Sequence, residues 1–294
     1  MLKMSGLDAN PVLLSTRDNG IALFPNRSKF NYVIASVLLD GKTILLDATD
    51  KFASTNTLPT RDLNSKGRLI NNDGSSNEID LIPKYNSVNN VNLVVNLDTN
   101  GKIEGKVREF YFDYNALKFR TKYSGMSKEV YLEKLEKKYP GLEIENYEVA
   151  NEKQVYEPII ESYSIKNANV VEKLGDKMFF SPMLHLALKE NYFRQEDRKY
   201  QVDFAFPSKE KYSIVISIPE GYKIESLPKA ASFSTENKYL SFNFSTTNQG
   251  NQIVVILNLE YNNSVIPAEY YSSLKEFFKL VIEKQNEKIV LKKI

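Results

Sequence analysis

Apolar and polar residues alternate over short segments along much of the chain, and turn-forming residues separate these segments. The clearest case is a pair of apolar segments, residues 31–39 and 42–49, that only Asp40-Gly41 separates. This dipeptide supplies the two positive-φ residues that a type I′ turn requires. The pattern therefore predicts an antiparallel hairpin, preceded by a short strand at residues 11–16.

The predicted turn also fixes which residues of the hairpin lie opposite one another. When Leu39 faces Lys42, Tyr32 and Asp47 become diagonal neighbours on one face, about 7–8 Å apart. A β-bulge in either strand would break this register. Without a bulge, we expect the side chains of Tyr32 and Asp47 to share one face of the sheet.

Beyond residue 75 the chain is dominated by strand patterns with turn signals between them. A second Asn-Gly hairpin is predicted at residues 91–97 and 103–114, which flank Thr99–Lys102. Short strands at this spacing are typical of an antiparallel β-sandwich. Further strands are expected at residues 144–149, 158–166, 200–206, 212–218, 239–244, 252–261 and 289–291.

Two helices interrupt the strand pattern. The first is expected to begin at Ser127 as its N-cap and to end near Lys138, before Pro140-Gly141. The second runs from about residue 267 to 285, and its apolar residues recur at three- and four-residue spacing. We interpret this apolar face as core, because core helices are a commoner source of such faces than peptide- or membrane-docking helices.

A polar run at residues 71–77 is rich in turn formers and marks the strongest candidate boundary. It divides the chain into a first domain of residues 1–72 and a β-sandwich region of residues 73–294. A further division of the second region into two subdomains near residue 195 stays open. The expected fold class is mainly β, of the α+β type, with antiparallel strands and two helices in the larger region.

The amino-acid composition excludes several classes of functional site. The 294 residues include no cysteine, which excludes disulfides, thiolate metal ligands and cysteine nucleophiles from this sequence. The 39 Lys and Arg are scattered and balanced by 37 Asp and Glu, which argues against nucleic-acid binding. No apolar run approaches the length of a membrane span, and no signal-peptide pattern begins the chain. We therefore expect a soluble protein without nucleic-acid binding or membrane insertion.

Three segments resemble the second half of the transglutaminase-like core: Gly-Leu-Asp-Ala-Asn-Pro-Val-Leu-Leu-Ser-Thr-Arg at 6–17, Phe-Asn-Tyr-Val-Ile-Ala at 30–35, and Leu-Asp-Ala-Thr-Asp at 46–50. In that family a cysteine at the start of a helix is the nucleophile. A histidine on the next strand is its base, and an aspartate on the following strand orients the histidine. The resemblance implies that Asp47 matches the aspartate and Tyr32 matches the histidine.

The resemblance extends beyond the hairpin. Residues 1–5 look like the last turn of the family's helix, ended by Gly6 in a left-handed conformation, so the nucleophile's position would lie upstream of Met1. Residues 58–64 and 67–70 resemble the stretch after the core in a group of bacterial envelope proteins. The later strands and closing helix resemble the β region downstream of that core. The resemblance thus implies a periplasmic or cell-surface location in a Gram-negative bacterium.

These residues favour a non-catalytic role. A neutral phenol cannot replace imidazole as a general base at pH 7, and the chain has no thiol. The leading hypothesis is a binding or scaffolding module, a pseudoenzyme that contacts an envelope protein or peptide. Two alternatives stay open: a fragment of a cysteine peptidase or acyltransferase whose nucleophile lies upstream, and a glycan-binding β-sandwich, which the absence of Trp weakens.

The same residues also have a structural interpretation, in which Tyr32 is a buried aromatic residue whose hydroxyl group bonds to Asp47, and Asp47 caps the turn at Thr49-Asp50. Elsewhere the candidates are weaker. His185 lies in an apolar segment without a second histidine, so we interpret it as a core residue rather than a metal ligand. Neither a metal site nor a cofactor site is predicted. The remaining strand-associated carboxylates are isolated and lack calcium-loop spacing: Asp80, Asp98, Asp113 and Asp203.

Overall fold

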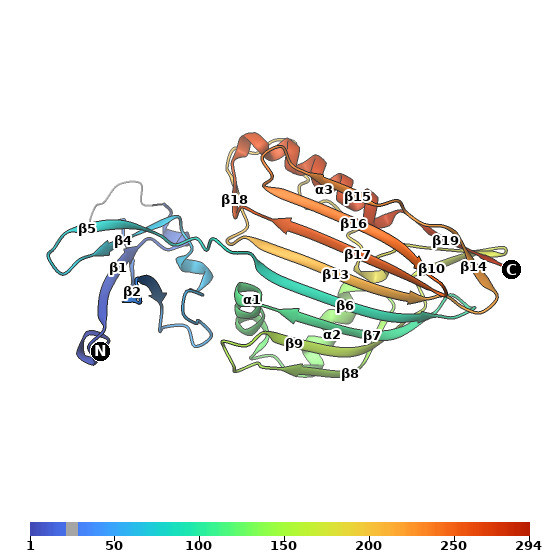
Figure 1. The fold of residues 1–294 in the computed structure, drawn as a ribbon, viewed down its shortest axis with the longest axis horizontal. Coiled ribbons are helices and arrows are strands. Elements are labelled where there is room, and N and C mark those ends of the chain that lie inside the picture. Colours follow the sequence, from blue (N-terminus) through green and yellow to red (C-terminus); the bar gives the residue numbers. More distant parts are fainter. Residues whose placement is uncertain (22–28) are drawn as a thin grey trace.

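A computed structural model describes residues 1–21 and 29–294 and shows a mainly β protein (Figure 1). A small sheet formed by the N-terminal residues lies beside a much larger sheet formed by the rest of the chain. Three α-helices occur within the described residues, one more than the sequence pattern predicted. The expected mainly β fold class is confirmed.

The small sheet has the strand order β3-β2-β1-β4-β5, and all its neighbouring pairs are antiparallel. The predicted hairpin is confirmed, because Leu39 lies opposite Lys42. Its turn residues have φ of 50° at Asp40 and 72° at Gly41, as a type I′ turn requires. The strands are β1 (Asp8–Leu14), β2 (Tyr32–Leu39), β3 (Lys42–Leu46), β4 (Lys66–Ile70) and β5 (Ser76–Asp80).

The passage between the two sheets lies later than the sequence suggested. The polar run at 71–77 is the turn of the β4–β5 hairpin, in which the Asn71 N–H donates to the Ser75 carbonyl group at 2.9 Å. The predicted boundary at 72/73 therefore falls inside the small sheet, which ends at Asp80. Residues 71–77 thus form a turn, as predicted, but this turn belongs to a β4–β5 hairpin that the sequence pattern did not predict.

The large sheet has the order β15-β16-β17-β13-β6-β7-β9-β8. β13 pairs with β6 in parallel, which corrects the expectation of a wholly antiparallel region and places residues on both sides of 195 in one sheet. The other pairs are antiparallel. The strands are β6 (Ser87–Leu97), β7 (Ile103–Tyr111), β8 (Leu142–Ala150), β9 (Ile159–Asn167), β13 (Ser208–Ser217), β15 (Ala231–Ser234), β16 (Leu240–Gln249) and β17 (Gln252–Tyr261).

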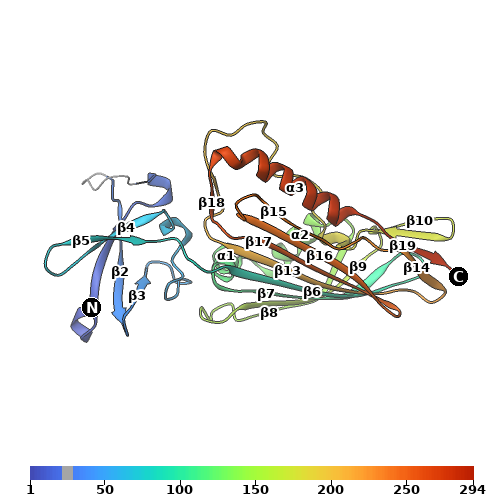
Figure 2. The same cartoon turned by 45° about the horizontal axis from the view of Figure 1, so that its top comes forward.

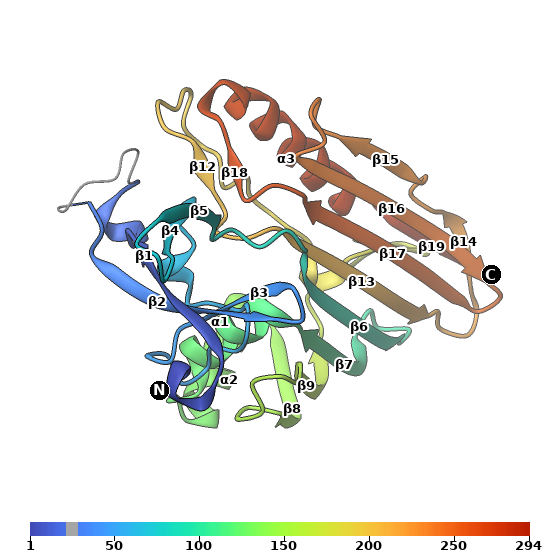
Figure 3. The same cartoon turned by 60° about the vertical axis from the view of Figure 1, so that its left-hand side comes forward.

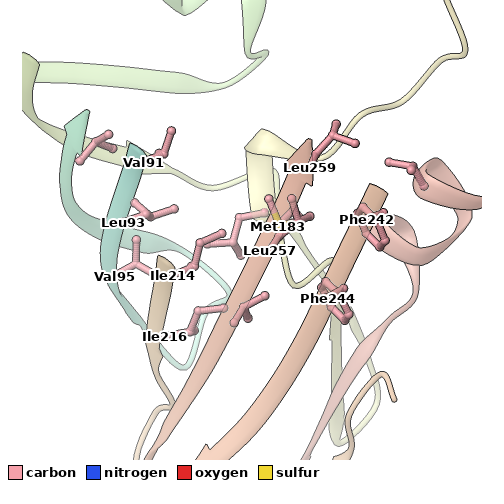
Figure 4. Packing of buried hydrophobic residues seen from close by; sticks show 14 of the residues in the cluster. Val91, Leu93, Val95, Met183, Ile214, Ile216, Phe242, Phe244, Leu257 and Leu259 are labelled. Carbon is pink, nitrogen blue, oxygen red and sulfur yellow. The ribbon is translucent and has the colours of Figure 1, made fainter. Parts of the chain in front are cut away.

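One face of the large sheet carries the core. Leu93, Ile214, Leu257 and Phe242 come from four neighbouring strands and are all fully buried (Figure 4). Their apolar cluster also includes residues of α3 (Tyr271–Asn286), which lies along the sheet (Figure 2). A second sheet joins the same cluster, with the order β10-β11-β19-β14. Its strands are β10 (Val171–Leu174), β11 (Lys177–Phe180), β14 (Tyr222–Ser226) and β19 (Ile289–Lys293).

The two expected helices are present. α2 (Lys128–Lys138) begins after Ser127, whose hydroxyl oxygen accepts the N–H of Val130, and α3 follows a short 3-10 turn at Ala268–Tyr270. The expected strand at 200–206 is reduced to β12 (Val202–Asp203), which pairs with β18 (Val265–Ile266). In the described ranges, no helix has the length and apolar character needed to cross a membrane.

The missed helix, α1 (Asp113–Tyr123), packs between the two sheets (Figure 3). The ring of Tyr114 stacks on Phe206 with the ring centroids 4.9 Å apart. The Tyr114 hydroxyl group donates to the carbonyl oxygen of Asn56 at 3.1 Å. Tyr114 and Leu117 belong to the apolar core of the small sheet, so α1 anchors that sheet to the rest of the molecule.

The N-terminal residues form a single 3-10 turn, Lys3–Ser5, rather than an α-helical turn. Gly6 ends this turn with φ of 78° and ψ of 10°, and its N–H donates to the carbonyl oxygen of Lys3. The predicted left-handed Gly6 is therefore confirmed. Glycine suits this position because it has no Cβ to clash in the left-handed region.

Candidate functional site

Tyr32 and Asp47 meet at one end of the β2–β3 hairpin. The Tyr32 hydroxyl group lies 3.1 Å from Oδ2 and 3.3 Å from Oδ1 of Asp47, within hydrogen-bonding distance. Tyr32 is the first residue of β2, and Asp47 directly follows β3. The contact confirms the predicted shared face, because the ladder continues without a bulge from Leu39 opposite Lys42 to Ala35 opposite Leu46.

Asp47 also organises the turn that follows β3. Its Oδ1 accepts the backbone N–H of Thr49 at 2.9 Å and the Thr49 hydroxyl group at 2.8 Å. A carboxylate that bonds the backbone two residues later forms an Asx turn. The structural interpretation of Asp47 as the cap of this turn is therefore confirmed, and the Asp47 side chain is buried. Tyr32, which that interpretation expected to be buried, is only partly buried.

Arg61 completes the cluster. Its Nη2 donates to Asp47 Oδ2 at 2.7 Å and also lies 3.1 Å from the Tyr32 hydroxyl group and 2.6 Å from Thr49 Oγ1. The guanidinium carbon sits 5.2 Å from the centre of the Tyr32 ring, within the range of a cation–π contact. Arg61 belongs to the 3-10 turn Thr60–Asp62, which follows Pro59. The resemblance of residues 58–64 to envelope proteins predicts no role for Arg61.

Asp62 is the second residue that sequence reasoning missed. It is fully buried, and neither carboxyl oxygen accepts a hydrogen bond from a described residue. Arg61 Nε is 3.7 Å from its Oδ1. Burial, reinforced by the neighbouring Asp47, raises the pKa of Asp62 to about 7. A charged pair such as Arg61-Asp62 beside Leu58-Pro59 was the signal available in the sequence.

The two carboxyl groups have opposite protonation behaviour. Burial acts to raise the pKa of Asp47, but hydrogen bonds from the backbone and side chain of Thr49 outweigh it and lower the pKa. Two adjacent buried carboxylates do not both ionise readily, so one keeps its proton. Asp47 is therefore the ionised member, and Asp62 holds its proton up to about neutral pH.

A pocket of about 440 Å³ opens beside this cluster. Asp50 and residues 59–61 line it from the side of the small sheet, and α1 supplies the other lining residues. The pocket thus places the charged cluster of the small sheet next to a helix of the larger region. Its lining residues are Asp50, Pro59, Thr60, Arg61, Leu117, Lys118, Thr121 and Lys122.

A second buried polar cluster lies on the inner face of the large sheet. Glu161 accepts the hydroxyl groups of Tyr111 and Tyr147, each at 2.7 Å. Glu109 lies opposite Glu161 across β7 and β9 and accepts the side-chain amide of Asn89 at 2.9 Å. Burial and the neighbouring Glu161 raise the pKa of Glu109 to about 7. The cluster thus retains a proton near neutral pH, and no sequence motif indicated it.

His185 is a core residue, as predicted, but it is not the satisfied histidine that was expected, because neither ring nitrogen has a hydrogen-bond partner among the described residues. It is buried against Tyr139, with ring centroids 5.0 Å apart in an edge-to-face arrangement. Burial lowers its pKa to about 4, so the ring is neutral at pH 7. Among residues 1–21 and 29–294, no group of three or more His, Cys, Asp or Glu side chains is placed to hold a metal ion.

The isolated acids predicted from the strand pattern do not converge. Asp203 forms an ion pair with Arg17 at 2.8 Å, and Asp80 lies 3.4 Å from Lys84. Asp98 caps its own hairpin turn by accepting the backbone N–H of Asn100 at 2.8 Å. Asp113 is the first residue of α1 and has a φ of 45°. Each of the four acids thus has a local structural environment of its own.

Comparison with known proteins gives two matches. A family model described as a domain of unknown function with a solved structure (DUF3858) matches residues 176–291. A crystal structure from Parabacteroides distasonis, described as a "putative protease", aligns with 99% of this chain at 12% identity and a TM-score of 0.48. The chain spans 41% of that protein's length. No curated protein matches the sequence.

Proposed function

We propose that this chain is a non-catalytic binding or scaffolding module related to the transglutaminase-like proteins of bacterial envelopes. One observation carries the proposal. Asp47, at the position matched to the family's orienting aspartate, is engaged by Arg61, Thr49 and Tyr32 at once. A catalytic aspartate must instead direct its charge to the imidazole of the base.

The chemistry of the neighbouring groups supports the same conclusion. Tyr32 stands at the position matched to the histidine, and its hydroxyl group takes part in the contacts of Asp47, Thr49 and Arg61. The Arg61 guanidinium neutralises Asp47 at 2.7 Å. The sequence contains no cysteine to act as a nucleophile. The cluster is thus suited to holding the hairpin and the 3-10 turn together.

The proposal is tested by assaying the purified chain for peptidase, amidase and transamidase turnover. We expect no turnover above the uncatalysed rate, because neither a thiolate nor an imidazole base is present at the cluster. Asp47→Asn is the matched variant. Turnover by the wild-type chain that disappears in a folded Asp47→Asn variant would overturn the non-catalytic assignment and favour the enzyme-fragment alternative.

We also propose a periplasmic or cell-surface location. It rests on the resemblance of residues 58–64 and 67–70, and of the later strands and closing helix, to a group of bacterial envelope proteins. Fractionation of the source cells with antibodies against this chain tests the location. Recovery with periplasmic or surface markers is expected. Recovery with cytoplasmic markers alone would contradict this part of the proposal.

A further inference from the structure

The pocket beside Arg61 has walls from two distant parts of the sequence. Asp50, Pro59, Thr60 and Arg61 line it from the small sheet's side. The other lining residues come from α1: Leu117, Lys118, Thr121 and Lys122. The apolar core of the small sheet holds Leu117 in place. Because the walls belong to packed elements, the pocket is formed before any ligand arrives.

The charged residues of the lining are predominantly cationic. The pocket has a volume of about 440 Å³. Its lining contains three basic residues, Arg61, Lys118 and Lys122, and one acidic residue, Asp50. Lys118 and Lys122 are exposed, and within the described part of the chain neither forms an ion pair with a carboxylate. Their spacing of four residues places both ammonium groups on one face of α1.

Arg61 is the rigid member of this cationic set. Its Nη2 is fixed by Asp47, Thr49 and Tyr32, whereas its Nη1 makes no hydrogen bond to any described residue. A guanidinium group held in place loses little side-chain entropy when it pairs with a carboxylate. Arg61 can therefore bind an anion while it keeps its contacts within the cluster.

We propose that this pocket binds a carboxylate-rich segment of an acidic peptide, an assignment that rests on the proposed binding function. The Lys118 and Lys122 ammonium groups pair with Asp or Glu side chains of the peptide, and Arg61 pairs with a third carboxylate. Thr60 and Thr121 are exposed and offer hydroxyl groups to the peptide backbone. Three basic groups and two hydroxyl groups spread over the pocket suit an extended acidic peptide better than a compact inorganic anion.

Fluorescence anisotropy with a labelled hexaglutamate peptide tests the proposal. Hexaglutamine is the neutral control peptide, and inorganic phosphate is the competitor. The test variant carries Lys118→Gln and Lys122→Gln. The control variant carries Lys134→Gln and Lys153→Gln, which remove the same charge from exposed lysines outside the pocket. We expect hexaglutamate to bind, and the pocket variant to bind about tenfold more weakly while the control variant is unchanged.

Three outcomes would overturn the proposal: no binding of hexaglutamate, equal weakening in both variants, or displacement by phosphate at concentrations similar to those of the peptide. The second outcome would show general charge attraction, and the third an unspecific anion site. The turnover assay separates this proposal from the proposed function. Absence of peptide binding together with absence of turnover rejects only the peptide pocket, whereas turnover rejects the non-catalytic assignment.

Discussion

Asp47 receives donors from three elements of the small sheet region: Tyr32 from β2, Thr49 from the turn after β3, and Arg61 from the 3-10 turn. A buried carboxylate is tolerated only when its lost hydration is replaced by hydrogen bonds and opposite charge. The cluster meets this requirement within the chain. Asp47 thus links three segments that are distant from one another in sequence.

Tyr32→Phe removes one of these donors and leaves the rest in place. We expect the variant to lose about 1–3 kcal/mol of unfolding free energy, towards the lower end because Thr49 and Arg61 still bond Asp47. Urea denaturation measures the change. Tyr200→Phe, at an exposed position, is the control and should be neutral. A negligible loss for Tyr32→Phe would show that its hydroxyl group is not needed by the buried carboxylate.

Asp62 predicts a dependence of stability on pH. Its pKa is raised to about 7 in the folded state from an ordinary value of 3.8. As pH rises, the unfolded chain therefore loses this proton at a lower pH than the folded protein does. The contribution of Asp62 is fully present below pH 3.8 and is lost as pH rises through about 7.

Asp62→Asn keeps a neutral side chain at every pH and should remove this dependence. We therefore expect the stability of the variant relative to the wild type to increase from pH 5 to pH 8. Urea denaturation midpoints at both pH values measure this change. Asp80→Asn, at an exposed position, is the control and should give parallel curves. If the difference in stability between Asp62→Asn and the wild type is the same at pH 5 and pH 8, the raised pKa is contradicted.

At the scale of elements, α1 depends on a buried arginine. Arg120 is almost fully buried, and its Nη2 donates to the carbonyl groups of Asn151, Gln154 and Glu157 at 3.0, 2.7 and 2.7 Å. Its Nε donates to the Glu152 carbonyl group at 3.2 Å. One guanidinium group thus holds the turn between β8 and β9 against α1.

Arg120→Ala leaves these carbonyl groups without their donor and opens a cavity beside the helix. We expect a loss of about 3 kcal/mol or more in unfolding free energy, because buried carbonyl groups without partners are costly. Arg120→Lys should restore only part of it, since an ammonium group cannot match the guanidinium fork. Lys134→Ala on exposed α2 is the control. If Arg120→Lys has the stability of the wild type, the positive charge alone, and not the guanidinium geometry, stabilises this region.

The sequence predicts an element well when its signal is local. The Asp40-Gly41 turn set the hairpin register, and Ser127 set the start of α2, because both depend on adjacent residues. α1 was missed because its apolar residues serve two different cores. Tyr114 and Leu117 face the small sheet, whereas Phe119 packs into the core of the large sheet, so no single apolar stripe appears.

The candidate site shows the same limit. The register brought Tyr32 and Asp47 together from the sequence alone. Arg61 and Asp62 were missed because the path from β3 to β4 follows no repeating pattern, so their approach to Asp47 depends on tertiary packing. Local turn chemistry thus predicted half of the cluster, and the fold supplied the rest.

At the scale of the whole molecule, the least predictable feature is the parallel pairing of β6 with β13. Strands paired in parallel need a long crossover. Here the crossover includes strands β7 to β12 and the helices α1 and α2. Short-range turn signals say nothing about such a partner. This pairing joins the two halves of the large sheet into one core, against which α1 holds the small sheet.

Asp47 has a structural role that depends on its ion pair with Arg61 at 2.7 Å. A double-mutant cycle with Asp47→Asn, Arg61→Gln and the double variant, followed by urea denaturation at pH 7, measures this pair directly. We predict a favourable coupling energy of about 1–2 kcal/mol. Additive effects of the two substitutions, within about 0.5 kcal/mol, would show that Arg61 does not hold Asp47 and would contradict the structural assignment.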